Sequence, residues 1–320
     1  MSSTEKLSVS KHKLKAQISL HSMMIPGLIF AIIFMIVPLF GIIIAFQDFS
    51  ESAGIFGSPI ANPIFINFYD IFKQGYFMIA LRNTVVIALV KIIALTISSI
   101  ILALLINEIQ SPILKKIIQT TIFLPYFLSW ILLGDMFVEM FGQYGVFNLV
   151  LETFGIKEWA IETFGVLNGI WIADMEAFFV IIILTDVWKN VGYQVVVFLA
   201  AITTINSNLY EAAEIDGAGH LQKCWHITIP GIKPMIILMS ILNIGNIMNA
   251  GFEQILTMYS TNVSDISEIL DTLIYKISLG SGVMQYEQAT AMGIFKSLIS
   301  CICFLVAYRI AFKVSDYKLF

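Results

Sequence analysis

Long uninterrupted apolar stretches dominate the pattern of this chain. A helix that crosses the hydrocarbon core of a membrane needs roughly 20 mostly apolar residues, with a range of about 17–25. Six stretches approach or exceed that length with at most two charges inside them: 22–47, 83–107, 117–134, 177–205, 234–252 and 288–308. The first is too long for the apolar region of a signal peptide and lacks a small-residue cleavage site. The pattern therefore predicts an all-α, polytopic membrane protein with six transmembrane helices.

The positive charges are unevenly divided between the connections. With the N-terminus inside, eleven of the eighteen Lys and Arg residues lie on the cytoplasmic side and three on the outer side. Because short cytoplasmic loops carry an excess of Lys and Arg, this bias predicts that both termini are cytoplasmic. The outer connections are long and acidic, at about 48–77, 141–176 and 257–286, and the inner ones lie at 108–116 and 206–233.

Composition narrows the class of protein. Only 12% of the residues are charged and 58% are hydrophobic, whereas soluble proteins carry about 25% charged residues. A net charge of −4 argues against a nucleic-acid partner. The chain has no Gly-x-x-x-x-Gly-Lys-[Ser/Thr] phosphate loop, its four His are scattered, and its three Cys form no metal or disulfide pattern. We therefore expect a protein in contact with membrane lipid that is not an enzyme and binds no cofactor or metal of its own.

The inner connection at 206–233 differs in composition from its surroundings. Asn208 followed three residues later by Glu211 predicts the start of a helix with a capping box. Glu214 and Asp216 add negative charge close to the positive end of that helix. The segment therefore predicts a short, well-capped helix between the fourth and fifth spans.

The rest of the predicted helix is slim and short. Ala212, Ala213 and Ile215 would give it a surface that fits a groove in another protein. Gly217 and Gly219 would end it. Taken residue by residue, the segment is equally compatible with an interfacial helix that only connects two spans.

The whole segment resembles the EAA loop of the inner-membrane permeases of binding-protein-dependent ABC importers. It reads Glu211-Ala-Ala-x-x-Asp216-Gly217-Ala218, then Ile227-x-Ile229-Pro230, then Pro234. It departs from the usual form in having Ile229 where Leu is commoner and Trp225 where Phe is commoner, both of which are apolar exchanges. The resemblance implies that the loop couples the permease to ATPase subunits through Glu211, Ala212, Ala213, Asp216, Gly217 and Pro230.

Other motifs extend the resemblance over about residues 22–320. Four look like the permeases of maltose-type carbohydrate importers: Trp188-Lys-Asn-Val-Gly192-Tyr, Phe198-Leu-Ala-Ala, Leu124-Pro-Tyr and Gly142-Gln-Tyr-Gly145-Val-Phe-Asn. Four look like the branch associated with aldouronate and alginate oligosaccharides: Gly251-Phe-Glu-Gln-Ile-Leu-Thr257, Asp271-Thr-Leu-Ile-Tyr275, Ala289-Thr-Ala-Met-Gly293-Ile-Phe-Lys296-Ser and the Tyr317-Lys-Leu-Phe320 ending. The resemblance implies a type I ABC importer permease fold, with a permease domain at 22–313 between cytoplasmic tails at 1–21 and 314–320.

The resemblance also implies partners. A second, homologous permease would complete a heterodimeric pathway for an oligosaccharide, acidic and polysaccharide-derived in the branch named above. Two ATPase subunits would bind ATP and Mg, and an extracytoplasmic solute-binding protein would dock on the outer loops. The chain would then be a multi-pass protein of the bacterial cytoplasmic membrane.

A different class of transporter stays open at this point. A stand-alone secondary carrier or channel for a small polar solute would share the composition, although no paired broken helices of an inverted repeat are visible in the pattern. A requirement for ATP and a binding protein distinguishes the two classes.

Polar residues inside the spans indicate where a sugar would bind, because such residues are costly in lipid and usually face a cavity. In maltose-type permeases the fourth and fifth spans line the sugar site, and the positions here that align with it are Tyr193, Asn246 and Asn249. Further candidates on the same spans are Trp188, Asn190 and Glu253. The alternative role for each is hydrogen bonding between helices.

The charged residues inside the spans have several possible roles. We expect Asp186 and Lys189 to form an i, i+3 salt bridge on the fourth span. The remaining cations are Arg82, Lys91 and Lys296. They could attract an acidic sugar or pair with Asp135, Glu139 or Glu253.

Overall fold

The computed structural model describes residues 21–280 and 284–315. Residues 1–20 of the predicted tail at 1–21 and the Tyr317-Lys-Leu-Phe320 ending lie outside these residues. Within them the chain is helical, with no strand beyond an isolated bridge between Gln47 and Ile60. Five helices are long and apolar enough to cross a membrane, or six if one bent pair counts as a single span. This confirms the all-α, polytopic class.

Contacts divide the chain into two units, Met1–Ile71 with Met284–Ile294 and Phe72–Val283 with Phe295–Phe320. In the first unit, the helix His21–Phe46 contains a π-turn, η1 (Ile32–Ile36), and a 3-10 segment, η2 (Val37–Phe46). Its side chains are almost all exposed and apolar, so it requires lipid or another protein around it. Beyond it lie the short helices α2 (Gly54–Gly57) and α3 (Ile66–Lys73).

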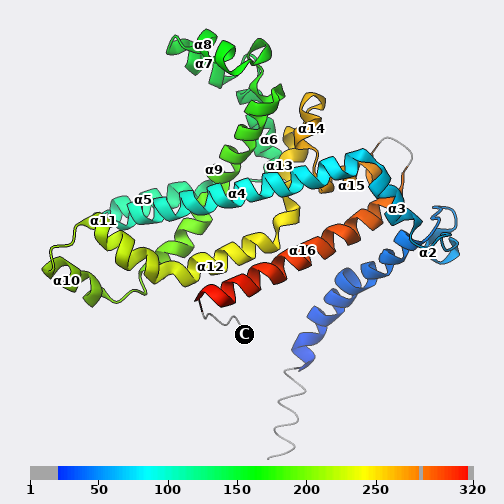
Figure 1. The fold of residues 1–320 in the computed structure, drawn as a ribbon, viewed down its shortest axis with the longest axis horizontal. Coiled ribbons are helices and arrows are strands. Elements are labelled where there is room, and N and C mark those ends of the chain that lie inside the picture. The colour runs from blue at the N-terminus through cyan, green and yellow to red at the C-terminus, as the bar shows by residue number, and fades with distance from the viewer. Residues whose placement is uncertain (1–20, 281–283, 316–320) are drawn as a thin grey trace, which may run out of the picture. The chain divides into compact units, whose positions relative to one another are not determined.

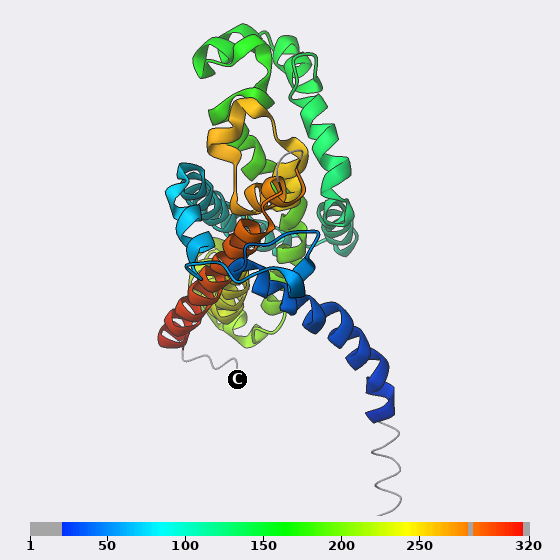
Figure 2. The same cartoon turned by 90° about the vertical axis from the view of Figure 1, so that its right-hand side faces the viewer.

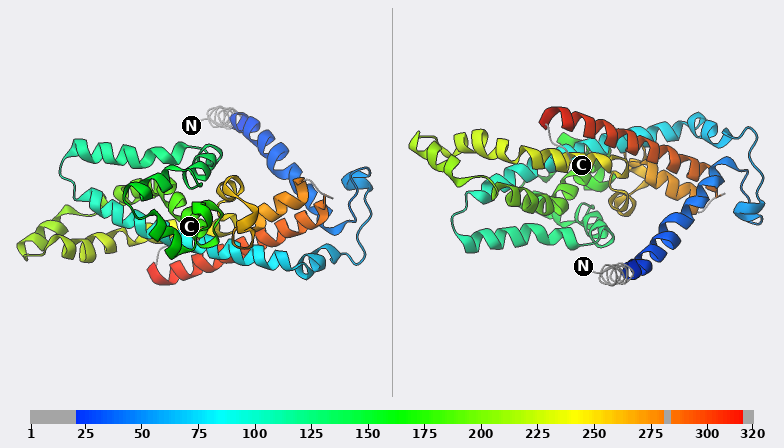
Figure 3. Two further views of the ribbon diagram at one scale, coloured as in Figure 1. Left: turned by 90° about the horizontal axis from the view of Figure 1, so that it is seen from above. Right: turned by 90° about the horizontal axis from the view of Figure 1, so that it is seen from below.

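The second unit is built around two long helices, α4 (Gly75–Asn107) and α9 (Met175–Ile202), which pack along each other. The chain turns back after α4 into α5 (Pro112–Phe123), and both α5 and α12 (Ile229–Gly245) pack on α9 (Figures 1 and 3). The core between these helices consists mainly of buried apolar side chains: Ala103, Ile106, Val195, Phe198, Leu199 and Ile232.

The third predicted span is broken rather than straight. After α5, a 3-10 turn, η3 (Leu124–Phe127), leads into α6 (Trp130–Met140), and the two parts of the span are bent by 98°. Pro125 removes a backbone donor from the turn, and Ser129 caps α6 by accepting from the Leu132 amide at 3.4 Å. The expectation of one continuous helix over 117–134 is therefore wrong.

The fifth predicted span is broken as well. The helix begins earlier than expected, through α11 (His220–Lys223) and the π-turn η6 (Cys224–Thr228), and α12 ends at Gly245 instead of continuing to 252. A 3-10 segment, η7 (Ile247–Asn249), follows, and then Ala250 and Gly251 both have left-handed backbone, with φ of 47° and 86°. The chain resumes as α13 (Phe252–Met258), which packs on α6.

The connection after α6 forms a small helical lobe (Figure 2), with α7 (Val146–Thr153), α8 (Lys157–Phe164) and the turns η4 (Leu167–Gly169) and η5 (Trp171–Ala173). Asn148 holds it together. Its amide group donates to the carbonyls of Gly142, Gln143 and Gly169 at 2.7–3.1 Å, and its oxygen accepts from the Trp171 indole at 2.9 Å. Every polar atom of this buried side chain therefore has a partner.

The remaining elements follow α13. They are η8 (Thr261–Val263), α14 (Ser264–Ser267), α15 (Leu270–Leu279) and α16 (Tyr286–Ser315). Lys296 of α16 forms an ion pair with Asp271 of α15 at 2.5 Å. The Lys276 ammonium loses solvation by burial, but its contacts with Glu268 and Tyr259 outweigh this and raise its pKa above the usual value.

Gly192 allows α9 and α5 to touch backbone to backbone, because a Cβ there would overlap the carbonyl of Ile122. Gly192→Ala should therefore destabilise the protein by about 1–3 kcal/mol through overpacking, measured as the midpoint of thermal unfolding in detergent. Gly293→Ala is the matched control, since it lies within α16 and its Cβ would meet nothing within 4 Å. Equal stability of the two variants would contradict the close contact.

Candidate functional site

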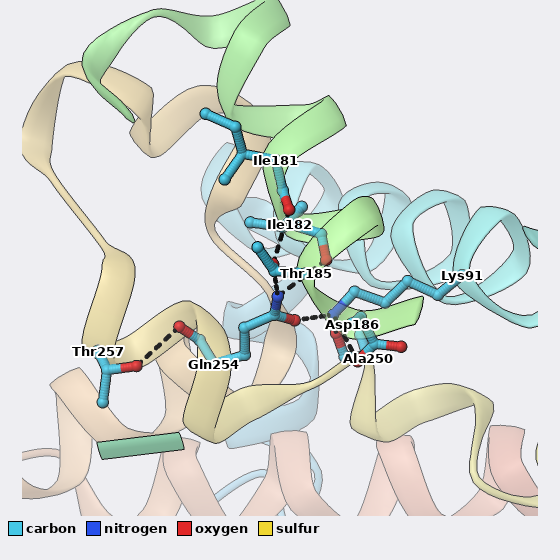
Figure 4. Close-up of polar contacts among 8 residues, drawn as sticks. All are labelled: Lys91, Ile181, Ile182, Thr185, Asp186, Ala250, Gln254 and Thr257. Atoms are coloured by element: carbon cyan, nitrogen blue, oxygen red, sulfur yellow. Dashed lines mark hydrogen bonds and ion pairs between the residues drawn. The ribbon is translucent and has the colours of Figure 1, made fainter. Parts of the chain in front are cut away.

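A buried ion pair lies where the fifth span breaks (Figure 4). Lys91 of α4 is 5% exposed, and its Nζ lies 3.6 Å from Oδ1 of Asp186 on α9. The same ammonium donates to the carbonyl of Ala250 at 3.1 Å and to Oε1 of Gln254. Three helical segments that are distant in sequence therefore meet at one cation.

Gln254 links the break to α9. It is fully buried, and its amide group donates to the Ile182 carbonyl and to the Thr185 hydroxyl, each at 2.8 Å. Gly251, with φ of 86°, lies against Lys91 so closely that a Cβ would meet the Nζ atom. The left-handed backbone and the missing side chain are thus both required here.

The break in the helix explains why a buried cation and a counter-charge are needed at this position. A break inside a membrane helix frees backbone carbonyls, which are costly in lipid unless they find a donor. Lys91 supplies that donor to Ala250, and Asp186 balances the charge that this introduces. A buried ion pair with further hydrogen bonds is the arrangement in which two charges can be kept out of water.

These contacts decide between the roles that the sequence left open for the charged residues. Lys91 pairs with Asp186, so the expected Asp186–Lys189 salt bridge is wrong. Lys296 pairs with Asp271, whereas Arg82 donates to Asn83 and to a backbone carbonyl. None of the three pairs with the carboxylates considered for them, which were Asp135, Glu139 and Glu253.

A pocket of about 200 Å³ opens beside the network. Its polar lining consists of Lys91, Asp186, Asn243, Asn246 and Asn249. Asn246 and Asn249 are exposed, while Asn243 is half-buried and its Nδ2 atom has no hydrogen-bond partner. Two of the predicted sugar contacts therefore share one polar pocket, although they lie at the break and not at helical spacing on one continuous α-helix.

The other predicted sugar contacts are distributed differently. Tyr193 is half-exposed and stacks on Tyr126, with 5.1 Å between ring centroids and 13° between planes. Trp188 lies on the opposite side of α9, where it contacts Phe137 edge-on at 5.8 Å. The remaining two do not join the pocket: Asn190 is half-buried on α9 and Glu253 is exposed in the first turn of α13.

The inner connection forms the predicted short helix, α10 (Ser207–Ile215), which projects from the bundle (Figure 1). Its cap is Asn206 and not Asn208, because Asn206 has extended backbone and its Oδ1 accepts from the Asn208 amide at 3.0 Å. The helix ends as expected at Gly217, whose φ is 77°. The Gly217 and Ala218 amides donate back to the carbonyls of Glu214 and Ala213 at 3.0 and 2.8 Å, which is a Schellman motif. Gly219 has extended backbone and begins α11 instead.

Side-chain contacts fix α10 to the following segment. The Tyr210 and Thr228 hydroxyls are 2.9 Å apart, and Lys223 donates to Glu214 at 2.7 Å. The hydrogen bond from Lys223 and its charge lower the pKa of the Glu214 carboxyl. This contact is therefore present above the ordinary pKa of a carboxyl and is lost as the pH falls through the lowered value.

Most of the coupling residues predicted in the 206–233 loop are accessible at its surface. Of the predicted coupling residues, Glu211, Ala212, Asp216, Gly217 and Pro230 are exposed and Ala213 is half-buried. Large apolar side chains are exposed beside them: Leu209, Ile215, Leu221 and Trp225. A projecting helix with exposed apolar side chains is typical of a protein-docking surface.

Sequence reasoning assigned no specific role to three contributors to these sites. Gln254 and Thr185 tie the break to α9, and Tyr126 forms the stack with Tyr193. Gln254 lies inside the Gly251-Phe-Glu-Gln motif, so an amide just after a Gly in an apolar stretch was the available signal. Tyr126 belongs to the Leu124-Pro-Tyr motif, but the motif does not indicate the stack with Tyr193, and no signal marked Thr185.

The features described so far define a membrane transport subunit, and comparison with known proteins shows which kind. Residues 96–315 match the family described as binding-protein-dependent transport system inner membrane component, and the chain belongs to this family. It is 35% identical to the polygalacturonan/rhamnogalacturonan transport system permease protein YteP of Bacillus subtilis (strain 168), over 95% of this chain and 91% of that protein. It is 34% identical to Protein LplB of the same organism, over 94% of this chain and 91% of the relative.

Solved structures agree with this assignment. A chain of a bacterial ABC transporter involved in the import of the acidic polysaccharide alginate superposes with a TM-score of 0.82 at 28% identity, covering 95% of this chain and 98% of that chain. A second structure of a bacterial alginate ABC transporter contains an alginate pentasaccharide-bound periplasmic protein and gives the same TM-score. The ABC permease fold and the permease role are therefore confirmed, and ATP hydrolysis in such importers is performed by separate subunits.

Proposed function

We propose that this chain imports acidic oligosaccharides across the bacterial cytoplasmic membrane as one half of a heterodimeric permease. The observation that carries the proposal is the amide-lined pocket beside the Lys91–Asp186 pair, placed midway along two spans of a permease-family chain. Intramembrane polar groups of this kind mark transport pathways. One relative is named as a polygalacturonan/rhamnogalacturonan transport permease, and a structural neighbour is involved in alginate import. Both support an acidic carbohydrate as the substrate.

The proposal also places the chain in the membrane. Both termini and α10 would face the cytoplasm, in keeping with the distribution of Lys and Arg. Two ATPase subunits, which bind ATP and Mg, would dock on α10 and on its counterpart in the second permease. A solute-binding protein would deliver the sugar at the opposite side, in keeping with the complex between the alginate transporter and its alginate pentasaccharide-bound periplasmic protein.

The sugar would contact the polar pocket and the exposed aromatic ring on α9. Asn246 and Asn249 offer amide groups, and Tyr193 offers a face on which a pyranose ring can stack. Trp188 and Asn190 on α9 and Glu253 on α13 remain further candidates, although none of them lines the polar pocket.

Uptake into proteoliposomes tests the proposal. The complete complex should accumulate tetragalacturonate only with internal ATP and with the loaded binding protein outside. Uptake by this chain alone, without ATP, would indicate a stand-alone carrier instead.

Replacing Asn249 by Leu should lower uptake and substrate-stimulated ATPase activity about tenfold, the loss expected for one or two hydrogen bonds to a ligand. Assembly should be unchanged, because Asn249 is exposed. Ser240→Ala is a suitable control, since this hydroxyl only donates to the Ile236 carbonyl of its own helix at 2.8 Å. If assembly of Asn249→Leu fails while residual complexes transport normally, Asn249 is a structural residue.

A further inference from the structure

Lys189 is a buried cation with no carboxylate partner. It is 7% exposed, and its Nζ donates to the backbone carbonyl of Tyr126 at 3.0 Å. No carboxylate of the described residues lies within 4.0 Å of it, since the nearby Asp186 is bound to Lys91. An ammonium group has three donors, so two of them are not used in hydrogen bonds to the described residues.

Aromatic rings surround this ammonium. It lies 5.5 Å from the centroid of Tyr126 and 5.6 Å from that of Trp130. Ring faces stabilise a cation without neutralising it. The positive charge of Lys189 is therefore held in place and left available to an anion.

Lys189 also lies next to the proposed sugar platform. Tyr126, which accepts its hydrogen bond, stacks on Tyr193. Asp186, Lys189 and Tyr193 follow one another at helical spacing and so share a side of α9. Asp186 lines the polar pocket, and Lys189 and Tyr193 follow it along α9 within two helical turns.

We propose that Lys189 recognises the carboxylate of a uronic acid whose ring stacks on the Tyr126–Tyr193 pair. This inference rests on the proposed function and names the residue that selects acidic over neutral sugars. Lys91 cannot do this in the present arrangement, because Asp186 already neutralises it. Lys189 provides both the unpaired charge and the free donors that a carboxylate requires.

Equilibrium binding to the complex in detergent, without ATP, tests this role. The probes are tetragalacturonate and its fully methyl-esterified form, which keeps the rings and removes the charge. Wild type should bind the free acid at least tenfold more tightly at low salt, and added salt should reduce the difference. Lys189→Met should weaken binding of the free acid by about 10- to 100-fold, the worth of a charged hydrogen bond, and leave binding of the ester unchanged.

Two variants complete the design. Lys189→Arg should keep the preference for the acid, and Lys157→Met, which removes a half-buried cation paired with Glu152 in the helical lobe, should also keep it. Equal loss of both probes in Lys189→Met would show a structural role, and wild type binding both probes equally would overturn the proposal without any variant. In either case ATP-dependent uptake of tetragalacturonate would leave the proposed function standing, whereas absence of such uptake would refute the function itself.

Discussion

Replacing Lys91 by Met is expected to destabilise the protein by about 3–5 kcal/mol, because it leaves Asp186 buried without a counter-charge. It also removes the donor from the Ala250 carbonyl and from Gln254, so the break in the fifth span loses its main tie to α4. The midpoint of thermal unfolding of the complex in detergent, together with the yield of folded protein, measures the effect.

Two further variants show whether the buried pair is the cause. Lys296→Met removes a cation from the more accessible Asp271 pair, in which the side chains are 24% and 17% exposed. That change should cost less than Lys91→Met, because both side chains of this pair keep more access to solvent than the Lys91–Asp186 pair. The double variant Lys91→Met/Asp186→Leu removes both buried charges and should recover much of the loss, since apolar replacements of buried pairs are often tolerated. A single Lys91→Met variant as stable as wild type would show that the pair does not secure the break.

The long spans could be predicted from the sequence because a long apolar stretch in a membrane must satisfy its backbone hydrogen bonds within the segment, and a helix does this. α4, α9 and α16 lie where the pattern placed them, although α4 begins at Gly75 and not at 83, α9 ends at Ile202 and not at 205, and α16 continues to Ser315 and not to 308. The two breaks could not be predicted in the same way. The apolar pattern of a span is the same whether its helix is continuous or broken. The fifth span is broken by the left-handed φ angles of residues 250 and 251, which the apolar pattern does not reveal.

The charged residues show a second reason for failure. Asp186 and Lys189 are three apart, and this local spacing suggested a pair. Lys91 is distant in sequence, yet packing of α4 against α9 brings it to Asp186 at 3.6 Å. Contacts between helices depend on their rotation about their axes, which the apolar pattern of a span buried on several sides does not specify.

The loop at 206–233 was predicted more fully because its signals are local. Turn and cap residues act through backbone groups within a few positions, so α10 and its end at Gly217 followed from the sequence. The start was misplaced by two residues, since Asn206 and Asn208 are equally good caps and only backbone conformation distinguishes them.

Replacing Gly217 by Val should uncouple ATP hydrolysis from uptake. The residue has a φ of 77° and ends α10 in the Schellman motif, and a Cβ there would meet nothing within 4 Å. The substitution therefore introduces no clash and acts only through the left-handed backbone, which costs a non-glycine residue about 1–2 kcal/mol. That energy is enough to shift the end of an exposed helix, which corresponds to a change of about 5- to 30-fold in a local equilibrium.

The membrane-embedded helices should not respond to this change, because α10 contributes no buried side chain to their core. Gly217→Val should thus assemble normally, while uptake falls about 5- to 30-fold and the loaded binding protein no longer stimulates ATP hydrolysis. Gly217→Asn is the matched control, because Asn adopts left-handed backbone more readily and should retain most of the uptake. Near-normal uptake by Gly217→Val, or by the bulkier Gly217→Trp, would show that the geometry of α10 does not transmit the ATPase cycle to the permease.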